Sequence, residues 1–287
     1  MNPYIAQMQR ITSVQEIFKI SQELRIKGKK IGFVPTMGAL HNGHLSLVSR
    51  AKDENDVAIC SIFVNPTQFN EPADFQRYPR TLEKDIEMLE SVGCDFLFTP
   101  SASEIYPVPD QTVYELGNVA EVLEGKHRPG HFNGVASVVK KLFEFVQPHR
   151  AYFGLKDYQQ YLVIKKLVEN YQIGVDVIGC PIIRSADGLA MSSRNKLLAK
   201  TEAEHALILN HSLKRAQQLI KEGDSPEKVE RIISEDLSSK GVDLEYFAIR
   251  NAEDLSKPTP STEALVALVA GRFGKVRLID NMNLSKS

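Results

Sequence analysis

The sequence predicts an α/β fold, a doubly wound parallel sheet with a smaller C-terminal α+β domain, from three observations. Short continuous apolar runs alternate with helix-length segments through the first 180 residues, as in a Rossmann-like sheet that is covered on both faces. The pattern changes after Pro181, where two long helical segments precede three runs rich in strand formers. The length of 287 residues suits about two domains.

The first part of the chain supplies the elements of the parallel sheet. A helix is expected from Val14, with Ser13 and Glu16 as a capping box and Gly28 as its stop. Strands are expected at 30–34, 57–64, 95–99, 112–116, 151–153 and 175–178. Helices are expected between them at 43–55, 81–92, 135–146 and 157–170.

The second part begins with a long helix at 201–222 and another that starts near Pro226. Strands are expected at 242–249, 265–270 and 275–279. We therefore expect a Rossmann-like domain over residues 1–184 and a smaller α+β domain over residues 185–287. The hinge is expected near 180–185.

Composition excludes several classes of protein. The chain has 35 Lys and Arg against 36 Asp and Glu, a net charge of −1, which argues against nucleic acid as the main partner. Three scattered cysteines, Cys60, Cys94 and Cys180, form no disulfide framework and suit a reducing cytoplasm. The N-terminus lacks an apolar signal-peptide core, and the longest apolar run, 264–270, is too short to cross a membrane.

The segment PTMGALHNGH, residues 35–44, lies between an expected strand and an expected helix. Ligands of open α/β sheets bind outside the carboxyl ends of the strands, and a helix N-terminus attracts phosphate. Gly38 and Gly43 allow close approach of the backbone, and His41 and His44 can donate hydrogen bonds. The alternatives are a tight turn with two surface histidines, or a zinc pair, for which no third ligand lies nearby.

Two further segments also follow expected strands. Asn65 and Gln68 carry amides that can read the hydroxyl and carboxylate groups of a small substrate, although an ordinary proline turn would have the same sequence. Lys156 lies near the start of a helix, where it suits phosphate. The neighbouring Asp157 is either a helix cap or a contact to ribose or metal.

Two loops are rich in cations, hydroxyls or glycines. Residues 124–134 form either a mobile anion-binding flap or a solvated loop. In residues 184–195, Ser192, Ser193 and Arg194 can surround a polyphosphate, with a serine-rich linker as the alternative.

The motifs PTMGALHNGH, FVNPTQF, RPGHFNGV, FGLKDYQQ and DGLAMSSRN, in this order and spacing, resemble the pantothenate synthetase family of AMP-forming pantoate–β-alanine ligases. His41-x-x-His44 with the later Met191-Ser192-Ser193-Arg194 also resembles the paired signatures of the nucleotidylyltransferase superfamily and of class I aminoacyl-tRNA synthetases. The resemblance to the ligase family runs from about Gly32 to Asn195 and is weaker in the C-terminal domain. It implies that ATP and pantoate form pantoyl adenylate and pyrophosphate. The amine of β-alanine then displaces AMP to give pantothenate.

The resemblance also implies roles for individual residues. His44 is the proton donor, Gln68 contacts pantoate and β-alanine, and Gln160 holds pantoate, while Asn65 is a further substrate-binding candidate. With His44, the residues His41, Lys156 and Arg194 are the donors available to the charged phosphates. The implied ATP site comprises Pro35, Met37, Gly38, Ala39, Leu40, His41, Asn42, Gly43, His44, Gly154, Leu155, Lys156, Asp157, Ile183, Met191, Ser192, Ser193 and Arg194.

The family implies Mg²⁺, a homodimer and a cytoplasmic location in vitamin B5 synthesis. Glu83 and Asp85 are candidates for the metal, but Lys84 interrupts them, so no metal ligand is assigned. Two other functions remain open: a nucleotidylyltransferase that acts on a phosphate acceptor, and a non-catalytic nucleotide-binding protein. The net charge and the lack of a basic anticodon-binding domain disfavour a tRNA synthetase.

Overall fold

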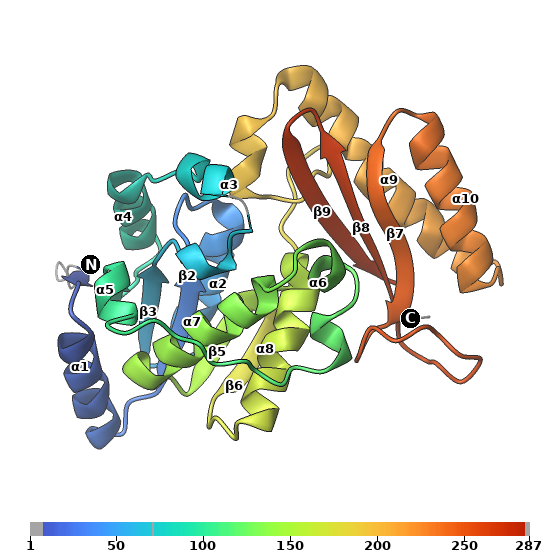
Figure 1. Ribbon diagram of the computed structural model, residues 1–287. Coiled ribbons are helices and arrows are strands. Elements are labelled where there is room, and N and C mark those ends of the chain that lie inside the picture. The colour runs from blue at the N-terminus through green and yellow to red at the C-terminus, as the bar shows by residue number, and fades with distance from the viewer. Residues whose placement is uncertain (1–7, 71, 285–287) are drawn as a thin grey trace. The chain divides into compact units, whose positions relative to one another are not determined.

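The computed structural model describes residues 8–70 and 72–284, which form two compact units (Figure 1). The first unit contains the described residues up to Leu155 together with 163–181. The second contains 156–162 and 182–284, so a short segment from the middle of the chain belongs to it. The domain boundary expected after residue 184 stays a prediction.

The first unit is built on a six-stranded parallel sheet, as predicted, with strand order β1-β4-β3-β2-β5-β6. From β2 the chain adds β3 and β4 on one side, and β5 and β6 on the other. The strand order therefore reverses between β2 and β5, and ligands of such sheets bind outside the carboxyl ends at this switch point. The strands are β1 (Gln9–Ile11), β2 (Ile31–Thr36), β3 (Val57–Ile62), β4 (Phe96–Phe98), β5 (Arg150–Gly154) and β6 (Asp176–Cys180).

Both faces of this sheet are covered, which explains the continuous apolar runs. The ring of Phe33 on β2 packs 6.4 Å from that of Phe143 on α7 (His131–Val146). The next residue, Val34, points to the opposite face and joins the core with Leu47 and Val48 of α2 (Asn42–Glu54). Helix α1 (Val14–Ile26) packs against α7, and α4 (Leu82–Ser91) against α2.

The remaining elements of this part of the chain are short, apart from α8. They are η1 (Pro66–Gln68), α3 (Pro72–Arg77), α5 (Ala102–Ile105), η2 (Asn118–Ala120), α6 (Glu124–His127), η3 (Leu155–Asp157) and α8 (Tyr158–Asn170).

No helix within residues 8–70 and 72–284 combines the length and apolarity needed to cross a bilayer.

Two local predictions are wrong, and in both cases side chains distant in sequence bind the backbone. The expected strand at 112–116 is irregular, because Asn133 binds Thr112 O and Tyr114 N, at 2.9 and 2.8 Å, in place of a neighbouring strand. The Ser13 side chain makes no capping hydrogen bond. Instead, Val14 N at the start of α1 donates to the Glu104 carboxylate at 2.8 Å.

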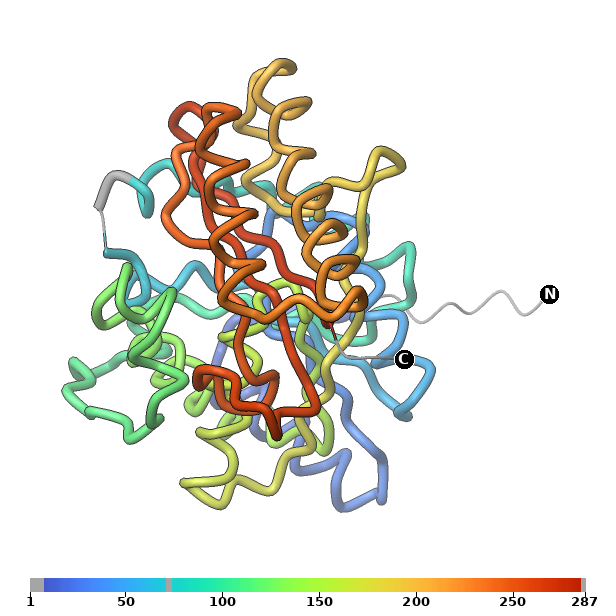
Figure 2. The backbone as a smooth tube through the Cα atoms, turned by 90° about the vertical axis from the view of Figure 1, so that its right-hand side faces the viewer, coloured from blue at the N-terminus to red at the C-terminus, as the bar shows by residue number. Residues whose placement is uncertain are grey.

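The second unit confirms the α+β prediction. Its antiparallel sheet has the order β7-β8-β9, formed by β7 (Asp243–Asn251), β8 (Leu265–Phe273) and β9 (Val276–Asn283). Helix α9 (Lys200–Lys221) packs on β8 and β9, and α10 (Pro226–Ser239) packs on β7 and α9, as Figure 2 shows. The short η4 (Ser193–Leu197) precedes α9.

Candidate active site

The loop between β2 and α2 has an unusual backbone at the switch point of the sheet. Gly38 has a φ of +80° and Ala39 a φ of +52°, so two successive residues adopt left-handed conformations. A Cβ at Gly38 would lie 2.9 Å from Ile62 Cγ2. Glycine is therefore required at position 38 both for its φ and for the lack of space, and the loop lies directly against β3.

A buried carboxylate holds this loop from outside it. Asp85, in the first turn of α4, is 1% exposed. Its Oδ2 accepts from Ala39 N and its Oδ1 from Leu40 N, both at 2.8 Å, and Oδ1 also accepts from Thr81 Oγ1 at 3.1 Å. Charge-assisted hydrogen bonds of this kind are stronger than neutral ones. Asp85 therefore fixes the left-handed turn that leads to the two histidines.

His41 and His44 flank the start of α2. His41 caps the helix: its Nδ1 accepts from Gly43 N at 3.1 Å, and its carbonyl accepts from His44 N and Leu45 N. In the neutral ring the proton then lies on Nε2, which makes His41 a hydrogen-bond donor at that atom. The two ring centroids are 4.0 Å apart. The structure thus brings both histidines to one helix N-terminus.

The turn after β3 places Gln68 beside the same loop. Gln68 Nε2 lies 2.9 Å from Met37 Sδ, and Gln68 Oε1 accepts from Asn65 Nδ2 at 3.3 Å. Asn65 is 1% exposed, and its amide is engaged by protein groups. Its Nδ2 also donates to Gly134 O, and its Oδ1 accepts from Thr67 and Tyr106. Asn65 is therefore placed to orient Gln68.

The end of the segment 124–134 is not solvated, because it packs against this turn, whereas residues 126, 127, 129 and 130 are exposed. An anion-binding flap in this segment stays a prediction. His131 is 7% exposed, and its Nδ1 donates to Gln68 O at 2.8 Å while its Nε2 accepts from Arg128. A Cβ at Gly134 would lie 2.4 Å from Thr67 O. This supporting role of His131 was not predicted; the signal in the sequence was Gly134, three residues further along α7, which marks a close approach to the turn.

In the second unit, residues 156–162 carry Lys156 and Gln160. The Lys156 ammonium lies 3.6 Å from Asp157 Oδ1. The backbone carbonyl of Lys156 accepts a hydrogen bond from Asn281 Nδ2 at 2.8 Å. Tyr158 donates its hydroxyl proton to Ala252 O at 2.7 Å. Burial raises the pKa of Tyr158 to about 12, so this donor keeps its proton at neutral pH.

Residues 183–195 form a turn and a short 3₁₀ helix in the same unit. Met191 N donates to Ile183 O at 3.0 Å, and a β-bridge joins Arg184 to Ala190. Ser192 Oγ accepts from Arg194 N at 3.3 Å and so caps η4. The turn therefore presents residues 191–194 from a defined backbone, which excludes a structureless linker.

Each unit brings together part of the predicted ATP and substrate sites. The first unit collects residues 35–44 with Asn65 and Gln68. It also contains Gly154, the last residue of β5, which lies beside β2, and the following Leu155. The second collects Lys156, Asp157 and Gln160 with Ile183 and residues 191–194. Within the described ranges, no group of three His, Cys, Asp or Glu side chains could hold a metal ion.

Comparison with known proteins gives one consistent result. The family model for pantoate-beta-alanine ligase matches residues 9–283. Pantothenate synthetase of Acetivibrio thermocellus is 46% identical over 277 residues, which are 96% of this chain and 99% of that protein.

Solved structures agree with the sequence comparison. A structure of the Thermus thermophilus pantothenate synthetase matches with a TM-score of 0.91 and 41% identity, covering 97% of this chain and 100% of that one. The pantoate-beta-alanine ligase of Francisella tularensis, in complex with beta-gamma ATP and beta-alanine, matches with a TM-score of 0.79 and 41% identity over 98% and 99% of the two chains.

Proposed function

Because this chain belongs to the pantoate–β-alanine ligase family, we propose how its own residues carry out the ATP-dependent condensation of pantoate with β-alanine. The near-complete match to that family carries the proposal. The products are pantothenate, AMP and pyrophosphate. Two other functions were open: transfer to a phosphate acceptor, and nucleotide binding without catalysis. A match to the ligase family over residues 9–283 argues against both.

The first step transfers an adenylyl group to pantoate. A carboxylate oxygen of pantoate attacks the α-phosphorus of ATP, and the bond to the departing pyrophosphate breaks. Negative charge then grows on the phosphate oxygens, at which donors fixed before the reaction stabilise it most. We assign this role to His41 and His44, which stand at the N-terminus of α2, where the helix dipole also favours anions.

The second step transfers the pantoyl group. The amine nitrogen of β-alanine attacks the acyl carbon of the adenylate, AMP leaves with the bonding electron pair, and the proton that the amine loses passes to water. No side-chain nucleophile is required. We assign His44 as the proton-donating residue of the site, in keeping with the family resemblance.

The nucleotide is assigned to the residues that the family resemblance implies. Met37–His44, with Pro35 at the end of β2, and Gly154–Asp157 supply backbone groups and the Lys156 ammonium. Residues Ile183 and Met191–Arg194 supply backbone donors, two hydroxyls and a guanidinium. Arg194 and Lys156 offset the charge of the polyphosphate.

The two glutamines are assigned to the substrates. Gln68 contacts pantoate and β-alanine, and Gln160 contacts pantoate, since each amide can donate and accept at once. Asn65, engaged by Gly134, Thr67 and Tyr106, acts on the substrates by orienting Gln68.

Three finer properties complete the proposal. Mg²⁺ would be held chiefly by the phosphates of ATP, where it would offset their charge. Both oxygens of Asp85 already accept backbone N–H groups. The family resemblance supports a homodimer. The free, buried thiols of Cys60, Cys94 and Cys180 support a reducing, cytoplasmic location.

Pyrophosphate exchange tests the reaction order. Exchange of labelled pyrophosphate into ATP should require pantoate and Mg²⁺ but not β-alanine, because the adenylate forms before the amine attacks. Steady release of AMP should require β-alanine. Exchange at the same rate without pantoate would exclude the ligase assignment, and binding of ATP with no exchange would favour the non-catalytic alternative.

Separate titrations of ATP and pantoate test the substrate assignment. Gln68→Ala or Gln160→Ala should cost roughly 1–3 kcal/mol, the cost of leaving a bound polar group unpaired. The KM for pantoate should rise about 5- to 150-fold. ATP affinity without pantoate should change less than about twofold, because neither amide is assigned to the nucleotide. Lys156→Ala should instead weaken ATP first.

The exposed Gln111 provides a matched control on an irregular loop. Gln111→Ala should leave both affinities unchanged. Equal losses of ATP and pantoate affinity in the glutamine variants would place Gln68 and Gln160 in the nucleotide site or in the fold, and would withdraw their assignment to substrate.

A further inference from the structure

Two consecutive polar residues of β9 are buried within the second unit. Asp280 is 4% exposed and Asn281 is 5% exposed. Successive side chains of a strand point to opposite faces. Asp280 therefore shares a face with Leu278, which belongs to the hydrophobic core of this unit, and Asn281 points to the other face. A buried polar pair in a strand needs partners, and both residues have them.

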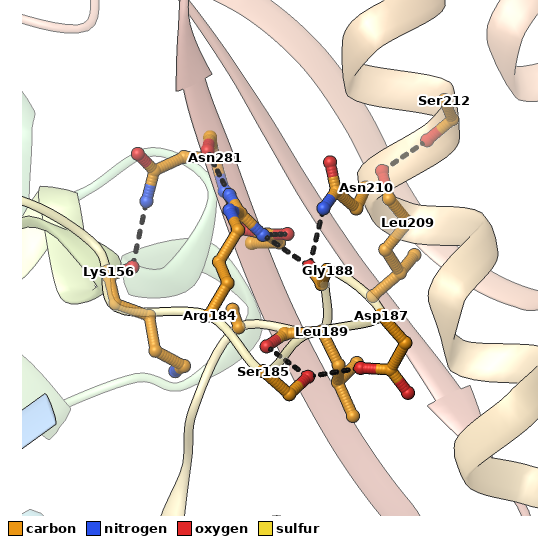
Figure 3. A network of polar contacts seen from close by, with 12 residues as sticks. Lys156, Arg184, Ser185, Asp187, Gly188, Leu189, Leu209, Asn210, Ser212 and Asn281 are labelled. Atoms are coloured by element: carbon orange, nitrogen blue, oxygen red, sulfur yellow. Dashed lines mark hydrogen bonds and ion pairs between the residues drawn. The ribbon is translucent and has the colours of Figure 1, made fainter. Parts of the chain in front are cut away.

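Asn281 holds the backbone at Lys156. Its Nδ2 donates to the Lys156 carbonyl at 2.8 Å, across 125 residues of sequence (Figure 3). The Lys156 side chain is 16% exposed, so its freedom to readjust is small. The position from which the Lys156 ammonium extends is therefore set by β9.

Asp280 holds the turn at Arg184. The guanidinium donates to it at two points, from Nη1 to Oδ2 at 2.6 Å and from Nη2 to Oδ1 at 2.9 Å. Arg184 also donates to Gly188 O at 3.2 Å, an oxygen that Asn210 Nδ2 binds as well (Figure 3). The bridge from Arg184 to Ala190 closes this turn just before Met191. Asp280 thus fixes the turn that leads into residues 191–194.

We propose that Asn281 and Asp280 are positioning residues for the nucleotide, which act through Lys156 and through residues 191–194. One strand sets the spacing between two segments that are assigned to the same polyphosphate. The inference rests on that assignment under the proposed function. Neither residue needs to touch ATP, and both act before binding by keeping the cationic groups in place.

Asn281→Asp tests the first half of the inference. The carboxylate has the shape of the amide but cannot donate to the Lys156 carbonyl. The Kd for ATP, titrated without pantoate, should rise about tenfold, the size of one lost hydrogen bond to a buried group. The KM for β-alanine should change less than about twofold. A merely structural role would lower the folded fraction and kcat, and would leave the Kd of the folded enzyme unchanged.

Asn283→Asp provides the matched control. This exposed residue lies two positions along β9, on the same face as Asn281, so the variant adds the same charge away from Lys156. Its Kd for ATP should remain within about twofold of that of the unchanged enzyme. A tenfold loss here as well would attribute the effect of Asn281→Asp to charge alone and overturn the inference.

A double-mutant cycle separates this inference from the proposed function. In the Lys156→Ala background, Asn281→Asp should change the Kd for ATP by less than about twofold, because its effect passes through Lys156. Equal losses in both backgrounds would overturn the inference alone. If Lys156→Ala itself leaves ATP affinity unchanged, the proposed role of Lys156 fails, and the inference fails with it.

Arg184→Lys tests the second half, and it does so even if Asn281→Asp fails to fold. Lysine keeps the charge opposite Asp280 but cannot bind it at two points. The Kd for ATP should rise at least about threefold, with the KM for β-alanine unchanged. An unchanged Kd in a folded Arg184→Lys enzyme would overturn the role of Asp280.

Discussion

His44→Ala is expected to lower kcat for adenylation by on the order of 10²–10³, the usual cost of removing one fixed donor to a developing oxyanion. His44 stands at the first turn of α2, beside His41, where pyrophosphate departure adds charge to the phosphate oxygens. A donor at this point binds the transition state more tightly than it binds ATP. The KM for ATP should therefore change much less than kcat, and single-turnover formation of pyrophosphate measures the difference.

His211→Ala is the matched control, because His211 is exposed on α9 of the second unit. It should leave kcat within about twofold, as surface substitutions usually do. The stability of His44→Ala should also change little, since its backbone hydrogen bond to His41 O remains. Near-normal pyrophosphate exchange by His44→Ala at saturating ATP would show that His44 is a structural residue.

The strands of the parallel sheet could be predicted from the sequence where both faces of the strand are buried, because such a strand is a continuous apolar run. The continuous apolar run at 57–64 forms β3, as expected of a buried strand, and the strand ends at Ile62, two residues earlier than predicted. β1 was missed because its three residues, Gln9–Ile11, are too few to show a periodicity. The irregular segment at 112–116 was mistaken for a strand, because strand formers say nothing about whether a neighbouring strand is present.

The site shows the same division between local and distant information. The loop at 35–44 and the cap at His41 are local, so glycines, histidines and their place after a strand were sufficient signals. The groups that hold this loop and the Lys156 backbone come from distant positions: Asp85 and Asn281. An acidic residue in the first turn of a helix equally suits the helix dipole, a metal or a distant backbone, and sequence alone does not separate them.

Asp85→Asn is expected to destabilise the protein by roughly 1–3 kcal/mol, because one of the two buried N–H groups of Ala39 and Leu40 loses its acceptor. The asparagine amide also places N–H donors opposite a backbone donor. The left-handed backbone at Gly38 and Ala39 then loses the restraint that keeps it. This loop leads directly into His41 and His44, so its movement would displace both side chains. We expect kcat to fall more than about tenfold, because the rate of the chemical step depends steeply on the position of the catalytic groups. Urea unfolding and pyrophosphate exchange provide the two measurements.

Glu83→Gln removes the same charge from the same turn of α4 at an exposed position. Its stability should stay within about 0.5 kcal/mol and its kcat within about twofold of the unchanged enzyme. If Asp85 were a metal ligand, the result would differ. Asp85→Asn would raise the Mg²⁺ concentration needed for activity, and in EDTA the variant and the unchanged protein would have the same free energy of unfolding. If Asp85 holds the loop at 38–40, the loss of stability should persist in EDTA, because both of its oxygens accept hydrogen bonds from the backbone of the loop without any metal.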